Sequence, residues 1–459
     1  MSSSTAHDGS RAAASDAVNH GAQLRRAVIA SAIGTTIEWY DFFLYSTVTG
    51  LVFAKLYFPK ADPLVGTLEA FAVYAVGFAA RPIGAAIFGH WGDRLGRKSA
   101  LIATLILMGV ATFLVGIVPT YASIGIWGAV LLTLLRFIQG IGVGGEWGGS
   151  VLLSMEWART DHHRGFVASW PQFGVPAGLF LANLAVLVFS AMSGDQFSSW
   201  GWRVPFLLSI VLVAIGLWIR LGILETPVFR RLIEEDRIER APVAEVFRLQ
   251  AKEVFLSAFV RMAEQAPFYI FTAFVFAYGV GTLKVSRDLL LTAVLVASVV
   301  SFFSIPIAGH LSDRFGRRRV YIVGAIATGV FGWIYFALLN TLVAFWIFAA
   351  IVVSLIPHDA MYGPQAALIA ESFTGRLRYS GASIGYQLAS IIAGGPAPLI
   401  AAALLASYGS WVAIAVYISI CAVISVIAAA LMQDYTGKDI SAEYAETDVI
   451  ASAAGESRM

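Results

Sequence analysis

The 459-residue sequence has few charged residues and a single cysteine. Charged residues make up 13% of the chain, hydrophobic residues make up 58%, and the mean hydropathy is +0.76. So few charges cannot cover a soluble globule of this size, so the composition places the chain in lipid. The lone Cys421 can form neither an internal disulfide nor a cysteine metal cluster. We therefore expect no metal, no redox centre and no cofactor.

The net charge is also small, at +2. Basic residues are scattered between apolar blocks and form no single face, which excludes a nucleic-acid partner. Residues 1–26 are polar and rich in Ala and Ser, and they lack the short apolar core and cleavage site of a signal peptide. We read them as a cytoplasmic N-terminal tail that is not cleaved.

Long apolar blocks dominate the rest of the sequence. Each has close to the roughly 20 residues that a helix needs to cross a bilayer. The pattern predicts an all-α membrane protein with twelve transmembrane helices. The predicted spans are residues 27–54, 64–90, 99–118, 124–157, 164–192, 202–222, 253–281, 287–310, 319–339, 341–370, 378–407 and 409–432.

The distribution of Lys and Arg predicts the orientation, because short loops retain positive charge on the cytoplasmic side. With the N-terminus inside, five basic residues lie at the outer face and three lie within spans, which leaves 23 of 31 in the cytoplasm. An even number of spans then puts both termini in the cytoplasm. The outer residues are Lys55, Lys60, Arg203, Lys284 and Arg287, and those within spans are Arg81, Arg136 and Arg261.

A sequence repeat divides the chain into two halves. Residues 89–98 (GHWGDRLGRK) and 309–318 (GHLSDRFGRR) follow the second and eighth spans and lie 220 positions apart. We therefore predict two pseudo-symmetric six-helix bundles, with a substrate site between them at mid-membrane. Their predicted bounds are 27–222 and 253–432, with a cytoplasmic loop at 223–252 and a cytoplasmic tail at 433–459.

The repeated segment resembles the signature of the major facilitator superfamily, and it occurs at the expected place in both halves. The resemblance to the metabolite:proton symporter branch extends from about Arg25 to Asp434. It implies the major facilitator fold and a monomeric secondary transporter in the bacterial inner membrane, which imports a small polar metabolite with protons. Carriers of shikimate, α-ketoglutarate, citrate, proline and betaine belong to that branch. The segments that resemble the branch are EWYDF (38–42), RP (81–82), RFIQG (136–140), GGEW (144–147) and ETP (225–227).

The repeated segment is also the predicted cytoplasmic gate. Its aspartate comes at the end of a span, where it can face the N-terminus of a neighbouring helix or pair with an arginine, while its glycines allow close packing. The alternative is that these charges only retain the loop inside, although retention requires no aspartate. The predicted gate residues are Gly89, Asp93, Arg94 and Arg97 in the first copy and Asp313, Arg314 and Arg317 in the second.

Ionisable residues within spans are candidates for coupling and binding, because they are costly in lipid. Five acids face three arginines there. If all were ionised, negative charge would remain in a low-dielectric interior, so at least one carboxyl is expected to carry a proton in part of the transport cycle. The acids are Glu38, Asp41, Glu146, Glu264 and Asp359.

In the N-terminal half, Glu38, Asp41 and Tyr45 share one helical face. Asp41 is our first candidate for the proton carrier. The alternative is a permanent structural pair between Asp41 and Arg81. Arg136 and Gln139 also share a face; the branch resemblance implicates Arg136 in coupling or substrate binding, and a permanent partner such as Glu146 is the alternative.

In the C-terminal half, Arg261 and Glu264 share a face, followed by Gln265 and Tyr269. Arg261 could hold a substrate carboxylate or only neutralise Glu264. His358, beside Asp359, could move protons or be a structural histidine. Further side chains could orient a polar ligand, although most aromatic residues in spans pack or face lipid. These are Tyr386 and Gln387 in the eleventh span and Trp170 and Gln172 in the fifth.

The expected substrate is a small organic anion, since buried arginines recognise carboxylates. Residues 358–359, 378–382 and 385–387 resemble the shikimate carriers most. An osmolyte symporter is the alternative, although the tail after Asp434 shows no sustained heptads of the kind found in proline and betaine carriers.

A membrane enzyme is disfavoured because no nucleotide-binding or nucleophile motif is found. A channel would need a repeated filter segment, and none is found.

Overall fold

The computed structural model describes residues 29, 31–95, 97–157, 163–221, 242–374 and 377–438, and within these ranges it contains helices and no strand. A helix over residues 31–48 opens the N-terminal half. It is followed by η1 (Thr49–Phe53), α2 (Ala54–Tyr57), α3 (Pro63–Ala79), α4 (Arg81–Leu95), α5 (Arg97–Ile117), α6 (Tyr121–Ile124), α7 (Trp127–Trp157), α8 (Arg164–Gln172), α9 (Gly174–Ser193), η2 (Gly194–Ser198) and α10 (Arg203–Leu221).

The C-terminal half has the same kind of architecture. Its elements are α12 (Pro242–Leu249), α13 (Ala251–Val260), α14 (Met262–Tyr269), η3 (Ile270–Phe274), η4 (Ala277–Thr282), α15 (Arg287–Phe315), α16 (Arg317–Leu339), α17 (Ala344–Ala370), α18 (Arg378–Ala389), η5 (Ser390–Gly394), α19 (Pro396–Tyr408) and α20 (Val412–Leu431).

Ten helices among the described residues are long and apolar enough to cross a membrane. The other two predicted spans are the helical runs 31–57 and 251–282. These runs carry Glu38 and Asp41 in the first and Arg261 and Glu264 in the second, and such residues lower hydropathy. The expected all-α protein with twelve transmembrane helices is confirmed.

Several predicted spans are interrupted. The seventh breaks after Val260 and continues through the wide turns of η3 and η4, and the eleventh passes through η5 between α18 and α19. Pro267, inside α14, lacks the N–H that would complete the helical ladder. The predicted spans 253–281 and 378–407 are therefore each built from several helical segments. Turns of the π type often mark functional positions.

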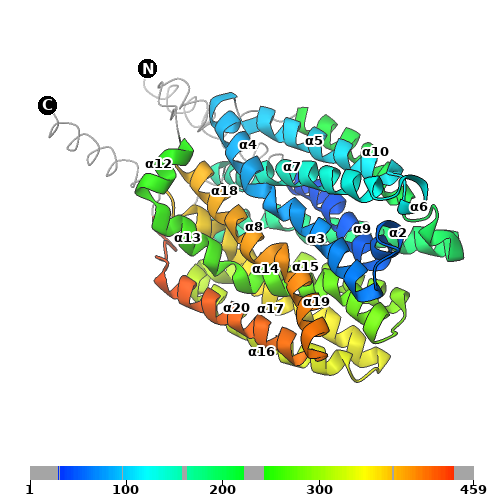
Figure 1. Ribbon diagram of the computed structural model, residues 1–459. Helices are drawn as coiled ribbons and strands as arrows, with labels where there is room; N and C mark the ends of the chain where they lie inside the picture. The colour runs from blue at the N-terminus through cyan, green and yellow to red at the C-terminus, as the bar shows by residue number, and fades with distance from the viewer. Residues whose placement is uncertain are drawn as a thin grey trace, which may run out of the picture.

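The two halves form two layers that face each other, with the blue to cyan N-terminal helices above the yellow to red C-terminal helices in Figure 1. α8 and α9 contact α15, α4 and α7 contact α18, and α3 lies beside α19. Glycine allows one of these close approaches: a Cβ on Gly309 would lie 2.8 Å from the Cβ of Ser169. The site that the sequence predicts between the two halves would therefore lie between these facing helices.

The repeated segment is mostly helical and not a loop, which corrects the prediction. α4 continues to Leu95 and α15 continues to Phe315. In the second copy the chain turns at Gly316, whose φ of 96° is a conformation that favours glycine. Asp313 and Arg314 therefore lie on the last turn of a helix, where their direction is set by the helix and not by a mobile loop.

Candidate functional site

A narrow cavity lies between the two halves near the centre of the protein. Trp39, Arg81 and Gln172 line it from the N-terminal half, and Tyr386 and Gln387 line it from the C-terminal half. Its volume is about 10 Å³, room for about one water molecule. The structure is therefore closed around this cavity, which is too small for any ligand larger than water.

An aromatic stack joins the halves at this cavity. The rings of Trp147 and Tyr386 stack with centroids 3.7 Å apart and planes inclined by 15°. The guanidinium carbon of Arg261 lies 3.2 Å from the centre of the Tyr386 ring. Trp147 and Arg261 each cover one face of the Tyr386 ring, so Tyr386 lies between them. The sequence predicted Tyr386 as a residue that orients a ligand.

Two predicted amides also bridge the halves. Gln387 Nε2 donates to the carbonyl of Gly144 at 3.4 Å. Gln172 Nε2 donates to the carbonyl of Tyr362 at 3.3 Å, while its Oε1 accepts from Trp147. Both side chains would lose these bonds when the halves part, which would free them for a polar ligand.

Arg81 is fully buried and has no ion pair with a carboxylate among the described residues. Its guanidinium carbon lies 4.3 Å from the ring centre of Phe42 and 4.2 Å from that of Phe78. Its one hydrogen bond is a long one, 3.5 Å to Ser390 Oγ in the other half, and Nε and Nη2 have none. The alternative of a permanent Asp41–Arg81 pair is not what the structure contains.

Arg136 is also fully buried without a carboxylate partner in the described ranges. It donates to Gln139 Oε1 at 3.1 Å, as their shared helical face predicts, and its Nη2 has no hydrogen bond. Its guanidinium carbon lies 4.2 Å from the ring centre of Phe42 and 4.3 Å from that of Tyr45. The alternative partner, Glu146, is bonded elsewhere. Aromatic faces hold both guanidinium groups by cation–π attraction.

Asp41 is 1% exposed. Neither of its carboxyl oxygens has a hydrogen bond of ordinary geometry within the described part of the chain, although the hydroxyl of Thr112 lies beside it. A buried ionised carboxylate without a partner is strongly disfavoured. Among the five predicted acids, Asp41 is the one whose two oxygens both lack a partner.

Glu38 and Glu146 share one arginine that the sequence interpretation missed. Arg220 Nη2 lies 2.8 Å from Glu38 Oε1 and 2.7 Å from Glu146 Oε1. The charge count had placed Arg220 in the cytoplasm, which is wrong: it lies in the last turn of α10 and is 4% exposed. The predicted surplus of buried acids therefore shrinks, since five carboxyls face four arginines and a histidine.

The C-terminal half holds its ionisable residues in one continuous chain. Arg261 Nη2 lies 3.0 Å from Glu264 Oε2, and Glu264 Oε1 lies 3.6 Å from His358 Nε2. His358 Nδ1 is 2.8 Å from Asp359 Oδ1, and the hydroxyl of Ser304 donates to the other Asp359 oxygen. Of the two roles considered for Arg261, it neutralises Glu264 in this structure. The histidine bridges two carboxylates, a geometry suited to moving a proton.

The remaining predicted binding residues are placed differently. Gln265 is buried, and its Oε1 has no hydrogen bond. The ring centres of Tyr269 and Phe78 lie 5.0 Å apart, across the boundary between the halves. Trp170 does not line the central cavity; it is partly exposed and contacts Phe166 and Phe173. In this closed state its ring packs in an aromatic cluster, so the role of Trp170 in orienting a ligand stays a prediction.

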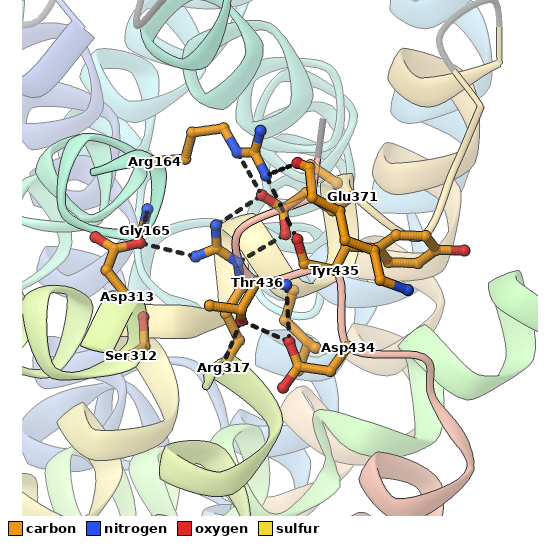
Figure 2. A network of polar contacts seen from close by, with 12 residues as sticks. Arg164, Gly165, Ser312, Asp313, Arg317, Glu371, Asp434, Tyr435 and Thr436 are labelled. Carbon is orange, nitrogen blue, oxygen red and sulfur yellow. Dashed lines mark hydrogen bonds and ion pairs between the residues drawn. The ribbon is translucent and has the colours of Figure 1, made fainter. Parts of the chain in front are cut away.

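The second copy of the gate segment forms the contacts shown in Figure 2. Asp313 accepts from the backbone N–H groups of Gly165 and Phe166, at 2.8 and 2.9 Å, at the N-terminus of α8 in the other half. Arg317 Nη1 lies 3.1 Å from Asp313 Oδ1. This is the predicted geometry of an aspartate that faces a helix N-terminus.

Glu371 completes this network and was not singled out from the sequence. It pairs with Arg317 at 2.6 Å and with Arg164 at 3.0 Å (Figure 2). Because Arg164 belongs to the N-terminal half and the other two to the C-terminal half, these pairs hold the two halves together. Its position one residue after a predicted span was the only signal in the sequence.

The chain after the last span also joins the gate, although it was interpreted as a tail. Arg164 Nη2 donates to the carbonyls of Tyr435 and Lys438, at 3.4 and 2.7 Å. Asp434 accepts from the N–H of Arg318 and from Thr436 (Figure 2). Burial opposes ionisation of Asp434, but these hydrogen bonds outweigh it and hold its pKa below the usual value.

The five other predicted gate residues are not part of the network in Figure 2. Arg314 is exposed, and its guanidinium carbon lies 5.5 Å from the ring centre of Phe315. Gly89 packs against Tyr379 in the other half: a Cβ placed on Gly89 would lie 3.6 Å from the Tyr379 ring. The side chains of Asp93, Arg94 and Arg97 lie outside the described residues. Arg314 is thus not part of the network.

Family models match both halves of the chain. Residues 27–246 match a model described as sugar (and other) transporter, and residues 254–452 match the major facilitator superfamily model. Among solved structures, the proton:xylose symporter XylE bound to 6-bromo-6-deoxy-D-glucose has a TM-score of 0.75 at 18% identity, with 93% of this chain and 99% of that chain covered. An inward open structure of XylE from E. coli has a TM-score of 0.65, also at 18% identity, with 92% and 99% covered. These structures share the fold.

Curated relatives are more similar in sequence. The shikimate transporter of Escherichia coli K12 is 43% identical over 416 residues, which cover 89% of this chain and 94% of that protein. The proline/betaine transporter of Salmonella typhimurium is 32% identical, with 91% and 85% covered. This protein is accordingly a metabolite transporter and not an enzyme. With such identity over most of its length, the chain belongs to the major facilitator superfamily, in the branch that includes these metabolite and osmolyte transporters.

Proposed function

We propose that this protein imports a small organic anion, shikimate or a related carboxylate, by proton symport. The observation that carries the proposal is the pair of buried guanidinium groups, Arg81 and Arg136, that have no carboxylate partner among the described residues. We place the protein as a monomer in a bacterial inner membrane, with both termini in the cytoplasm. The names of two relatives, a shikimate transporter and an inner membrane metabolite transport protein, support this placement.

The two arginines suit an anionic substrate for an electrostatic reason. A buried cation that lacks a counterion is costly, and a carboxylate that accepts from the free N–H groups would relieve that cost. Arg81 already reaches across to Ser390 in the other half. A carboxylate bound there would contact both halves, so its binding would favour the closed state over the open ones.

Asp41 is the proposed proton carrier. In the closed state it is buried without a partner, which suits a neutral carboxyl. When the halves open to the cytoplasm, water can reach the carboxyl and take its proton. The chain from Glu264 through His358 to Asp359 is the proposed second site for protons, because its groups are already within 3.6 Å of one another.

Alternating access follows from the gate contacts. Asp313, Arg317, Glu371 and Arg164 close the proposed cytoplasmic side in this structure. These pairs must separate before the substrate can leave to the cytoplasm. We propose that Asp93, in the first copy of the repeat, faces the start of α18 as Asp313 faces the start of α8. The two helices correspond, because α18 begins with Arg378 and α8 begins with Arg164.

A binding panel tests the proposal. Shikimate, α-ketoglutarate, citrate, benzoate and betaine would be added to purified protein, and the thermal transition measured, because a ligand that binds the folded state raises Tm. We expect a hydroxylated carboxylate such as shikimate to raise Tm and betaine to leave it unchanged. Stabilisation by betaine alone would favour the osmolyte alternative. Uptake into proteoliposomes, with and without an imposed pH gradient, tests the symport.

A further inference from the structure

A second and much larger cavity lies at the opposite end of the molecule from the gate. Its volume is about 690 Å³, within the range of small-molecule sites. It is lined from the N-terminal half by η1, α2 and the start of α3, and from the C-terminal half by η4 and α19. Because α3 lies beside α19 (Figure 1), the cavity is a space between the two halves and not a pocket within one of them.

The cavity has an exposed rim and a buried floor. Lys55, Pro59 and Lys284 are exposed, whereas Thr49 and Phe276 are buried. In the proposed orientation the rim opens toward the outside of the cell. The floor lies toward the central site. A solute could therefore occupy it while the cytoplasmic gate is closed, as it is in this structure.

The lining carries positive charge and no acid. Lys55 and Lys284 are the charged side chains that line the cavity, and they come from different halves. Neither has an ion pair among the described residues, and Lys284 Nζ donates to the carbonyl of Gly281. Three threonines, Thr49, Thr67 and Thr282, add hydroxyl groups to the lining. Two ammonium groups with hydroxyls over an apolar floor form an environment that suits a small hydroxylated carboxylate.

The floor lies next to the residues that hold Arg136. The Thr49 hydroxyl donates to the carbonyl of Tyr45 at 2.7 Å, and the Tyr45 ring is one of the faces that hold Arg136. The two halves pack closely at the floor, since a Cβ placed on Gly50 would lie 3.2 Å from the Cβ of Phe276. An anion on the floor is therefore about one helical turn from Tyr45.

We infer that this cavity is an outer vestibule, a first binding site for the organic anion, in which Lys55 and Lys284 attract the carboxylate before the halves open to admit it. The identity of the anion rests on the proposed function. The attraction of anions by the vestibule does not, because it follows from the charges that line it. Two kinds of measurement separate these claims.

The first measurement is the initial rate of shikimate uptake at low and at high ionic strength. In the double variant Lys55→Gln/Lys284→Gln we expect KM to rise by about threefold to tenfold at low salt, with the maximal rate unchanged. The difference should shrink at high salt, because salt screens exposed charges. Lys60→Gln is the matched control, since Lys60 is also exposed but does not line the cavity. An unchanged KM in the double variant would overturn the vestibule.

The second measurement needs no transport. The single native cysteine, Cys421, is buried, so a cysteine introduced as Thr67→Cys in a Cys421→Ser background reports on the vestibule alone. We expect a thiol reagent that carries a sulfonate to react several-fold faster than an uncharged reagent of the same class, relative to their rates with a free thiol. Lys55→Gln/Lys284→Gln should remove that advantage. Equal relative rates before the lysines are replaced would refute the inference, whatever the protein transports.

Discussion

The two halves of this transporter have similar helices but treat their buried charges differently. In the C-terminal half, Arg261, Glu264, His358 and Asp359 satisfy one another in a continuous chain. In the N-terminal half, Arg220 pairs with Glu38 and Glu146 and Arg164 pairs with Glu371 across the gate, while Arg81, Arg136 and Asp41 have no ionic partner in the described ranges. A duplicated fold can thus pair the ionisable residues inside one half and leave three of those inside the other half ready for a ligand and a proton.

The unpaired buried charges lower the stability of the closed state, and this cost indicates that they have a function. A buried arginine without a counterion weakens the closed state unless something compensates, and here aromatic rings do so in part. Such a cost is retained where function requires it. The comparison therefore predicts that substitutions in the unpaired set change transport, and that substitutions in the paired set change stability.

The largest effect is expected for Asp41→Asn, which mimics the protonated carboxyl. Uphill accumulation driven by a pH gradient should be lost, while exchange of labelled for unlabelled substrate continues, because exchange needs no return of the empty carrier. Uptake and counterflow in proteoliposomes measure the two activities separately. An Asp41→Asn protein that still accumulates substrate would exclude Asp41 and shift the role to Glu38, Glu264 or the His358–Asp359 pair. In the wild type, uptake should rise as the external pH falls.

Arg136→Lys tests the unpaired cations. A lysine keeps the charge but cannot both stack on the aromatic faces and donate to Gln139, so we expect uptake to fall by about 10- to 100-fold. Arg314→Lys is the matched control, because Arg314 is exposed and outside the gate network. Near-normal uptake by Arg136→Lys would show that a point charge is enough and that the planar group is not needed.

Asp313→Asn tests the gate. Loss of the charge at the N-terminus of α8 should weaken the closed cytoplasmic side and slow exchange by about threefold to tenfold, with substrate affinity changed much less. Asp93→Asn should act in the same way if the first copy has the same role. Asp288→Asn is the control, since it lies in the first turn of the same helix and its side chain is 69% exposed. Lost affinity with normal exchange kinetics would contradict the gate assignment.

The smallest effect on transport is expected for Asp359→Asn, which belongs to the paired set and lies at the end of the chain that is only the second proposed site for protons, after Asp41. Its main result should be a lower Tm, since the contacts with His358 and Ser304 are weakened at a cost of about 1–3 kcal/mol. Asp41→Asn should leave Tm unchanged or raise it. Thermal unfolding in detergent compares the two variants directly. A lower Tm for Asp41→Asn than for Asp359→Asn would contradict the distinction between an unpaired set in the N-terminal half and a paired set in the C-terminal half.

Part of the site could be predicted from the sequence. Arg81, Arg136 and Asp41 stood out because an ionisable residue in an apolar span is costly wherever it lies. Arg136 with Gln139 and Arg261 with Glu264 were also predictable, since both pairs are three positions apart on one helix, and both are bonded as expected. Tyr386 and Gln387 line the cavity between the halves, whereas Trp170 does not.

The sequence alone determined the twelve spans and the duplication, because hydropathy and repeats are properties of consecutive residues. Only the tertiary structure decided which charge meets which. Arg220 was missed because its partners, Glu38 and Glu146, lie 182 and 74 positions away. The contacts of residues 434–438 with Arg164 and Arg318 could not be predicted either, because those arginines lie in helices far away in the chain. An ion pair depends on the distance between side chains in space, which only the packing of the helices sets.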